Sequence, residues 1–284
     1  MTPNLHNKLA RWHSGVMYGL CVGFTAAILI LLVLVTGYLV SIGSASLSWD
    51  FFTKLPTGRT DNPGGMMHAV VGTALLVGFA SLVGIPIGML AGVYLAEYDV
   101  GSWFAGPVRF IADVLAGVPS IVVGVLGYEL LVVPLGHFNG WAGAMALAFI
   151  MIPIVTRTTE EMLRLVPGSY REASIALGAT KARTILKVVI PSATGSIVTG
   201  VMLAVARVAG ETAPLLFTAL GSRLLTTNPN EPFPSLTVQI YSYATGPYPE
   251  QKRLAWAGIL VLICLIFVLN LAIRFTTRRR HGSA

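Results

Sequence analysis

Long apolar stretches separated by short polar segments dominate the chain. The first stretch, 16–40, contains no charged residue, and five comparable stretches follow it. A helix needs about 20 mostly apolar residues to cross ~30 Å of hydrocarbon. The pattern therefore predicts an all-α integral membrane protein with six transmembrane helices. The predicted spans are 16–40, 69–96, 110–135, 141–160, 188–220 and 254–275.

The spans define one transmembrane domain, 16–276, between an N-terminal segment, 1–15, and a basic tail, 277–284. A cleaved signal peptide is the alternative interpretation of the first stretch, because Lys8 and Arg11 precede it. Its length far exceeds the 7–15-residue core of a signal peptide, so we favour a retained span. In the third span, Pro119 lacks an N–H and predicts a bend or break.

Composition agrees with a membrane protein. The chain of 284 residues is 55% hydrophobic and 11% charged, with a mean hydropathy of +0.75. The net charge of +7 raises nucleic acid as a ligand, but cytoplasmic loops of membrane proteins also collect Lys and Arg. With the N-terminus inside, thirteen basic residues fall in cytoplasmic segments and five outside. The bias predicts two cytoplasmic termini and no nucleic-acid partner.

The sequence lacks the motifs typical of nucleotide-binding, disulfide-bonded and metal sites. No GxxxxGK[ST] phosphate loop occurs, so the chain has no ATPase site of this kind. Cys21 and Cys264 both fall in apolar spans and match neither a disulfide framework nor a metal-ligand spacing. The histidines form no HExxH motif. We therefore expect no catalytic residue, metal or cofactor in this chain.

The polar loop 164–187 predicts two short helices that meet at a glycine. Ser169 followed by Glu172 has the spacing of a capping box, and Gly178 suits the position after a helix C-terminus. A second helix is expected to begin near Thr180 and run toward Pro191. The small face of the first helix suits docking in a groove of another protein. A helix lying on the membrane surface fits the pattern equally well.

The same loop, "EASIALGATKARTILKVVIP", resembles the EAA motif of the permease subunits of ABC importers. The matching positions are Glu172, Ala173, Ser174, Gly178, Val188, Ile190 and Pro191. Further segments, including "LAGVPSIVVGVLGY" and "ARVAGETAPLLFTA", resemble the PstA-type permease subunits of the bacterial phosphate-specific ABC importer. The resemblance extends from about 67 to 221. The nearest alternatives are a PstC-type subunit or a permease for another oxyanion.

The resemblance implies a type I ABC importer permease fold in the bacterial inner membrane. Its implied partners are a PstC-type permease, a PstB-type ATPase dimer that binds ATP and Mg, and a PstS-type phosphate-binding protein. It implies that a cytoplasmic coupling helix docks in a cleft of the ATPase. The residues that carry this role by resemblance are Glu172, Ala173, Ser174 and Gly178.

Arg207 and Glu211 are two charged residues inside the predicted fifth span. Residues four apart share a helix face, so we expect the two to pair and to face the bundle interior. A buried pair that only fixes packing is the alternative. Intramembrane ionisable residues commonly mark a substrate path, and the fork of Arg donors suits an oxyanion. We therefore predict that this pair lies on the phosphate pathway.

Three other features remain open. Asp113 is expected at the cytoplasmic boundary, and Glu129 at the outer interface without a role. The outer loop 221–253 contains "SLTVQIYSYATG", which suits either a short amphipathic helix or a solvated connector.

A secondary anion carrier is the competing class of function, and an intramembrane enzyme is a distant third because no nucleophile–base pair is visible. The EAA-like loop favours the importer, since a carrier needs no docking helix.

Overall fold

The computed structural model describes residues 3–59, 61–98 and 103–280. This part of the chain folds into helices and no β-sheet, which confirms the all-α prediction. The last four residues of the predicted basic tail lie outside the described residues. The helices are α1 (Pro3–Ala45), α2 (Trp49–Thr53), α3 (Met67–Glu97), α4 (Ala105–Gly117), α5 (Ser120–Gly127), α6 (Val133–Leu135), α7 (Gly140–Arg164), α8 (Gly168–Ala176), α9 (Lys181–Thr184), α10 (Ile190–Ala209), α11 (Ala213–Thr218), α12 (Leu236–Thr245) and α13 (Pro249–Arg280). Two π-helical turns, Tyr128–Val132 and Ile185–Val189, join α5 to α6 and α9 to α10.

Five described segments are long and apolar enough to span a membrane. They are Arg11–Ala45, Met67–Glu97, Gly140–Arg164, Lys181–Ala209 and Pro249–Val268. The predicted third span is instead a pair of helices, Ala105–Gly117 and Ser120–Leu135, bent by 103°. The bend that Pro119 predicted is present, and it is sharp enough that the pair is either a broken span or a re-entrant loop. Six straight spans are therefore a simplification.

The predicted fifth span, 188–220, also needs correction. Its helix begins earlier, at Lys181, and passes through the π-helical turn into α10. It ends at Ala209, and a separate helix, α11, starts at Ala213. Thr212 and Pro214 flank the start of α11, where the missing N–H of proline has no intrahelical partner to lose. The charged pair predicted inside one helix therefore lies at a helix end.

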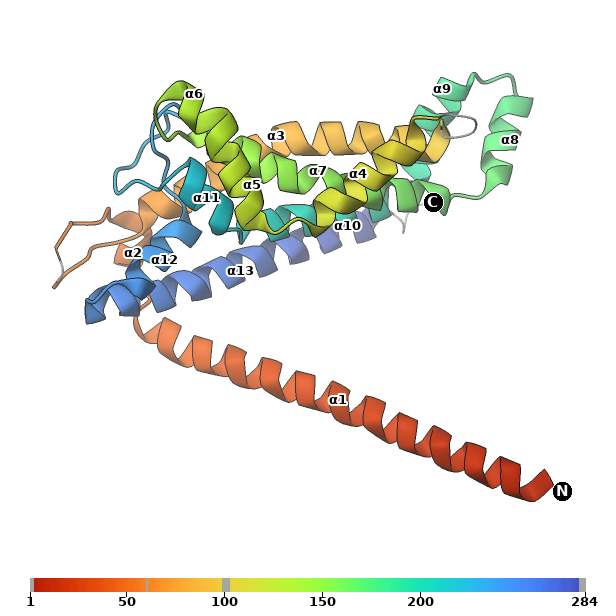
Figure 1. Cartoon of the computed structure of the whole chain (residues 1–284), viewed down its shortest axis with the longest axis horizontal. Coiled ribbons are helices and arrows are strands. Elements are labelled where there is room, and N and C mark those ends of the chain that lie inside the picture. The colour runs from red at the N-terminus through yellow and green to blue at the C-terminus, as the bar shows by residue number, and fades with distance from the viewer. Residues whose placement is uncertain (1–2, 60, 99–102, 281–284) are drawn as a thin grey trace.

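The core is built on the packing of α3 against α7, with α10 on α7 (Figure 1). Glycines let the two long helices approach closely. A Cβ on Gly88 would lie 2.7 Å from Cβ of Val155, and one on Gly92 would lie 2.6 Å from the carbonyl oxygen of Thr156. Contacts this short have no room for a side chain, so α3 and α7 form one tightly packed unit.

A second, smaller cluster lies at the end of the molecule that carries α2 and α12 (Figure 1). The α12 segment is the short helix that the sequence allowed, and its N-cap Ser235 accepts a hydrogen bond from the N–H of Val238. Tyr243 of α12 is buried in this cluster. Burial raises the pKa of its phenol above the ordinary value, so it stays neutral. The predicted outer loop 221–253 thus contains a packed helix, α12.

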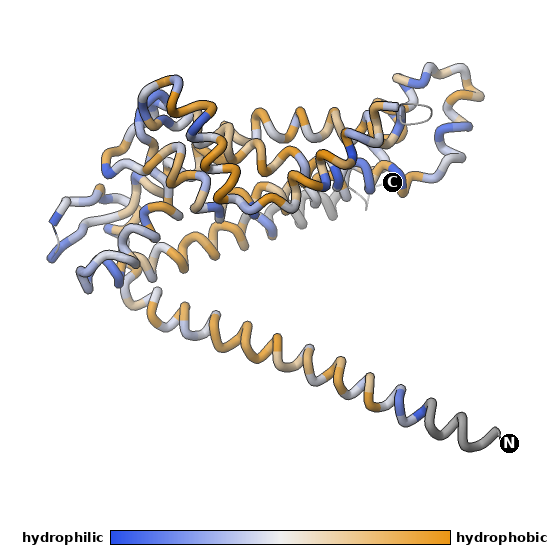
Figure 2. The backbone as a smooth tube through the Cα atoms, in the orientation of Figure 1, coloured by the Kyte–Doolittle hydropathy of each residue, from blue (hydrophilic) through white to orange (hydrophobic). Residues whose placement is uncertain are grey.

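The helix α1 stands apart from the remaining helices (Figure 1). Beyond its first turns, most of its tube is orange or pale in Figure 2, so apolar residues dominate that part of the helix. Of the α1 residues whose burial is described, only Leu39 and Gly43 are buried, where α1 meets α13. The free end of α1 and the last turn of α13 lie toward the end of the molecule that carries α8 and α9 (Figure 1). The exposed surface of α1 is suited to lipid or to another membrane subunit.

Candidate functional site

Arg207 and Glu211 meet at the end of α10. Arg207 lies in the last helical turn, the helix ends at Ala209, and Glu211 follows in the break before α11. The Nε atom of Arg207 lies 3.8 Å from Oε1 of Glu211. The predicted pairing is present, but it is long, and the carboxylate stands beyond the helix end. Such a pair leaves most of the guanidinium donors available.

The two side chains differ in exposure. The Glu211 side chain is 16% exposed, whereas that of Arg207 is 54% exposed. The expectation that both face the bundle interior is therefore wrong for Arg207. The reason is that Arg207 lies on a face of α10 that the other helices of this chain leave exposed at that level.

That face of α10 forms a stripe at helical spacing. Its exposed members are Ser192, Ser196, Thr199, Leu203 and Arg207. The opposite face is buried and apolar, and includes Ile197 and Ala204. An arginine in contact with acyl chains near the bilayer centre costs about 2.5–3.5 kcal/mol on insertion scales. The stripe is therefore suited to water or to another protein surface rather than to lipid.

A cavity of about 350 Å³ opens between α7 and α10 on the same stripe. Thr158, Met162, Ser196, Thr199 and Gly200 line it. The hydroxyls of Thr158 and Thr199 donate to carbonyl oxygens of their own helices, each at 2.9 Å. These bonds satisfy the backbone locally and leave hydroxyl oxygens facing the cavity. Polar groups thus continue along α10 from Arg207 toward α8 and α9.

The backbone of Glu211 is held by α12. The hydroxyl of Thr237 in α12 donates to the carbonyl oxygen of Glu211 at 2.9 Å, and the N–H of Glu211 donates to Val208 at 3.1 Å. The break between α10 and α11 is therefore fixed by α12. The sequence did not indicate this contact, because Thr237 and Glu211 lie in different predicted elements.

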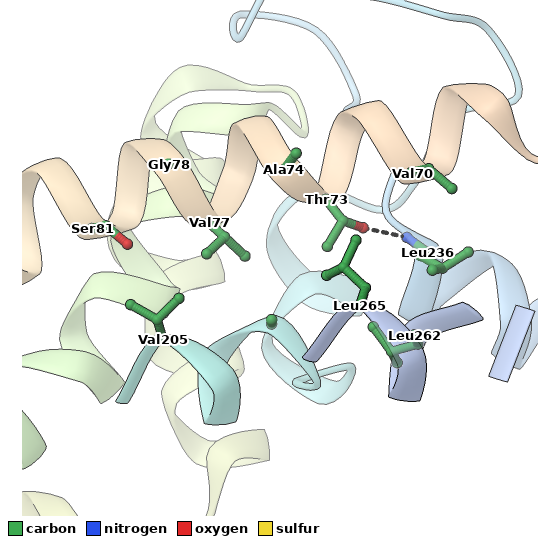
Figure 3. A pocket seen from close by; sticks show the side chains of 11 residues that line it. Val70, Thr73, Ala74, Val77, Gly78, Ser81, Val205, Leu236, Leu262 and Leu265 are labelled. Atoms are coloured by element: carbon green, nitrogen blue, oxygen red, sulfur yellow. Dashed lines mark hydrogen bonds between the residues drawn. The ribbon is translucent and has the colours of Figure 1, made fainter. Parts of the chain in front are cut away.

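A second cavity, of about 300 Å³, lies between α3, α10, α12 and α13 (Figure 3). Its lining is almost entirely apolar, with Val77, Val205, Leu262 and Leu265 among its residues. The hydroxyl of Thr73 accepts a hydrogen bond from the N–H of Leu236 at 2.7 Å. With its main polar group already engaged, this cavity is poorly suited to an anion.

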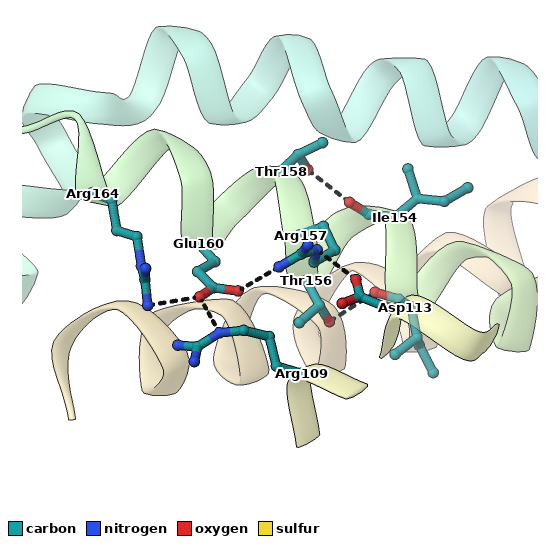
Figure 4. Close-up of polar contacts among 9 residues, drawn as sticks. Arg109, Asp113, Ile154, Thr156, Arg157, Thr158, Glu160 and Arg164 are labelled. Atoms are coloured by element: carbon teal, nitrogen blue, oxygen red, sulfur yellow. Dashed lines mark hydrogen bonds and ion pairs between the residues drawn. The ribbon is translucent and has the colours of Figure 1, made fainter. Parts of the chain in front are cut away.

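Charged side chains also gather where α4 meets α7 (Figure 4). Glu160 is almost fully buried and accepts from Arg109 at 2.7 Å and Arg164 at 3.0 Å, with Arg157 at 3.5 Å. Asp113, expected at the cytoplasmic boundary, pairs with Arg157 at 2.9 Å. The spacing of Arg157, Glu160 and Arg164 on one helix face was the available signal, but their partners on α4 were not predictable. The cluster fastens α4 to α7.

The predicted coupling loop contains the two expected helices. Gly178 follows α8 with φ +85°, a conformation that favours glycine, and the N–H of Ala179 donates to the carbonyl of Ser174 at 3.1 Å. The prediction of a capping box is wrong. The helix α8 already begins at Gly168, so Ser169 lies inside it and makes no capping bond. Pro167 fixes the start of the helix instead.

The outer surface of this loop is exposed and partly apolar. Glu172 and Ala173 are exposed, Ile175 is 55% exposed and Leu177 is 90% exposed. Ser174 points the other way and shares a hydrogen bond of 2.9 Å with Thr184 of α9. Of the four residues predicted to couple the chain to an ATPase, Ser174 therefore braces the loop, and Gly178 shapes it. Glu129 is exposed on the π-helical turn after α5.

The sequence matches a known family over most of its length. The family model of the binding-protein-dependent transport system inner membrane component matches residues 84–282. A Haemophilus influenzae protein named phosphate transport system permease protein PstA is 47% identical over 236 residues, which is 83% of either chain. The protein of the same name from Yersinia pestis is 43% identical and covers 84% of this chain and 81% of its own length.

Solved structures show the same fold at lower identity. A bacterial ABC transporter involved in the import of the acidic polysaccharide alginate aligns with a TM-score of 0.67 at 14% identity, covering 97% of this chain and 99% of that one. The inward-facing MetNI methionine ABC transporter aligns with a TM-score of 0.60 at 21% identity, covering 76% and 94%. These likenesses establish the ABC importer permease fold.

Proposed function

Because the chain belongs to the family of binding-protein-dependent transport system inner membrane components, we propose that Arg207 and Glu211 lie on the path by which it moves phosphate. The chain is a PstA-type permease subunit of a phosphate ABC importer, as its relatives of 42–47% identity over most of its length indicate. It is a multi-pass protein of the inner membrane. The observation that carries the site is the exposed guanidinium of Arg207 on the polar stripe of α10.

The chemistry of the pair suits phosphate. Arg207 offers a planar fork of donors for two oxygens of the anion. The Glu211 carboxylate repels a fully deprotonated anion but accepts a hydrogen bond from a protonated phosphate oxygen. Sulfate near neutral pH carries no such proton. Between transport events the carboxylate, 3.8 Å from the guanidinium, holds the arginine in place.

The exposed surfaces fit the partners that this function requires. A PstC-type permease covers the stripe of α10, so that Arg207 faces a path between two subunits. The exposed side of α8 docks on a PstB-type ATPase dimer, which binds ATP and Mg in place of this chain. A PstS-type protein delivers phosphate to the end that carries α2 and α12. The polar cavity between α7 and α10 then lies along the exit route.

Reconstitution tests this function. We expect the chain to copurify with a second permease and an ATPase, and the complex in proteoliposomes to take up phosphate only with ATP and the binding protein. Phosphate-loaded binding protein should stimulate ATP hydrolysis, whereas sulfate should not. Phosphate movement by the chain alone without ATP would contradict the proposal and support a secondary carrier.

The orientation of the chain can be measured by labelling. We expect both termini to be cytoplasmic. Single cysteines placed at Thr57 and Asn228, in a chain with Cys21 and Cys264 replaced by Ser, should react with a membrane-impermeant maleimide from outside. Cysteines at Thr180 and Ser283 should react only after the membrane is opened. Labelling of the Thr180 site from outside would reverse the proposed orientation.

A further inference from the structure

Both arms of the coupling loop are fastened to the same place, the last residues of α3. On the α8 side, Nη2 of Arg171 lies 2.5 Å from Oε1 of Glu97, and Nε lies 3.1 Å from each carboxylate oxygen. The Glu97 side chain is only 6% exposed and that of Arg171 is 23% exposed. A buried fork of this kind fixes direction as well as distance.

The same guanidinium also closes the end of α7. Its Nη1 donates to the carbonyl of Val166 at 2.7 Å, and Nη2 donates to that of Leu163 at 2.9 Å. Arg171 therefore joins α8 to both members of the α3–α7 unit. These bonds lie on the side of α8 that faces α3 and α7, whereas Leu177, directly after the helix, is exposed.

On the α9 side, the ammonium of Lys181 lies 4.4 Å from the ring centroid of Tyr98, directly after Glu97. Tyr98 in turn stacks on Tyr94 of α3. The bond between Ser174 and Thr184 ties the two arms to each other. The two helices α8 and α9, which meet at Gly178, are thus bonded to each other and held on α3 at two points. Displacement of α8 must therefore displace the end of α3.

The other end of α3 reaches the candidate site. Leu236 at the start of α12 donates to Thr73 of α3 at 2.7 Å, and Gly72 lies against the carbonyl of Pro234. The next residue of α12, Thr237, holds the carbonyl of Glu211. A continuous series of packed and hydrogen-bonded groups therefore runs from α8 through α3 and α12 to the break beside Arg207.

We propose that the Arg171–Glu97 ion pair is the positioning contact that passes movement of the coupling loop to α3, and through α12 to the Arg207–Glu211 site. The proposal rests on the proposed function, since it assumes an ATPase that moves α8. Arg171 and Glu97 act only through other residues and touch no phosphate. A contact that merely stabilised the fold would change the amount of assembled complex and leave its coupling intact.

The test measures phosphate transported per ATP hydrolysed by the assembled complex in proteoliposomes. We expect Glu97→Gln to lower this ratio by about tenfold, because the Arg171 guanidinium loses its charge-assisted hydrogen bonds to α3 and holds α8 there less firmly. ATP hydrolysis and assembly should stay within about twofold of wild type, since Arg171 keeps its bonds to the carbonyls of Val166 and Leu163 and the exposed face of α8 is unchanged. The matched control is Glu161→Gln, which neutralises an exposed glutamate on α7 and should keep the wild-type ratio.

A reversible link separates transmission from stability. In a chain lacking Cys21 and Cys264, we expect the double variant Glu97→Cys with Arg171→Cys to transport less phosphate per ATP hydrolysed. A short bifunctional crosslinker that forms a disulfide with each cysteine should restore this ratio. Reductant should then lower the ratio again. A wild-type ratio for Glu97→Gln, or a crosslink without effect on an uncoupled variant, would overturn the proposal. Failure of the unmodified complex to couple ATP to phosphate uptake would instead refute the proposed function.

Discussion

Arg207→Gln is expected to lower phosphate uptake by the assembled complex by about 10- to 100-fold, the loss typical of a hydrogen bond to a charged group. The substitution keeps a polar side chain but removes the positive charge from the exposed stripe of α10. Because the Arg207 side chain is 54% exposed in this chain, assembly and folding should change little. The measurement is uptake of labelled phosphate, normalised to the amount of complex.

The conservative change separates charge from geometry. Arg207→Lys retains the charge and loses the planar fork, so we expect it to keep partial activity at best. Glu211→Gln removes the repulsion toward anions and adds a donor. Discrimination against sulfate should then weaken even where phosphate uptake survives, as a competition assay with both anions would show.

A double variant distinguishes a substrate site from a structural ion pair. If the pair only fixed packing, either single change would strand a charge, and Arg207→Met with Glu211→Leu would restore both stability and transport. If Arg207 contacts phosphate, the double variant should assemble and remain inactive. Wild-type uptake by this variant, at equal amounts of complex, would remove the proposed site.

The features that the sequence predicted are those set by local chemistry. Apolar length located the spans, and the missing N–H of Pro119 located a break. The position of Gly178 predicted the elbow, because few other residues suit a φ of +85°. The capping box at Ser169 was wrongly predicted. The spacing from Ser169 to Glu172 is correct for such a box, but the N-cap of the helix is Pro167, two residues earlier.

The features that it missed depend on contacts between distant segments. Glu97 and Arg171 are 74 positions apart. In the sequence, Glu97 looks like an ordinary charge at the end of a span, and Arg171 looks like one of several charges in the loop 164–187. The angle of 103° at the Pro119 break and the end of α10 at Ala209 were not predicted, because local composition gives neither the direction of a break nor the exact end of a helix. The exposure of Arg207 was wrongly predicted because a spacing of four residues indicates that Arg207 and Glu211 share a helix face, but not whether the rest of the chain covers that face.

The second large effect is expected at the elbow of the coupling loop. Gly178→Val puts a β-branched residue at φ +85°, a strain of about 1–3 kcal/mol. The hydrogen bonds from Gly178 to Ile175 and from Ala179 to Ser174 close this turn, at 2.9 and 3.1 Å. Relief of the strain opens the turn and misplaces α8 relative to α9. A strain in the middle of this range should lower phosphate uptake by at least about tenfold.

The matched control uses Gly168, the glycine at the start of α8. Gly168 starts the helix with an ordinary φ, and nothing lies within 4 Å of an added Cβ. Gly168→Val therefore introduces the same side chain without the strain, and we expect near wild-type uptake.

Glu172→Lys tests the docking surface rather than the turn, by reversing an exposed charge. If α8 docks on the ATPase, Gly178→Val and Glu172→Lys should both separate ATP hydrolysis from uptake while the chain still inserts. Normal uptake by both variants would refute a docking role for this loop and leave the EAA-like pattern without the function that it predicts.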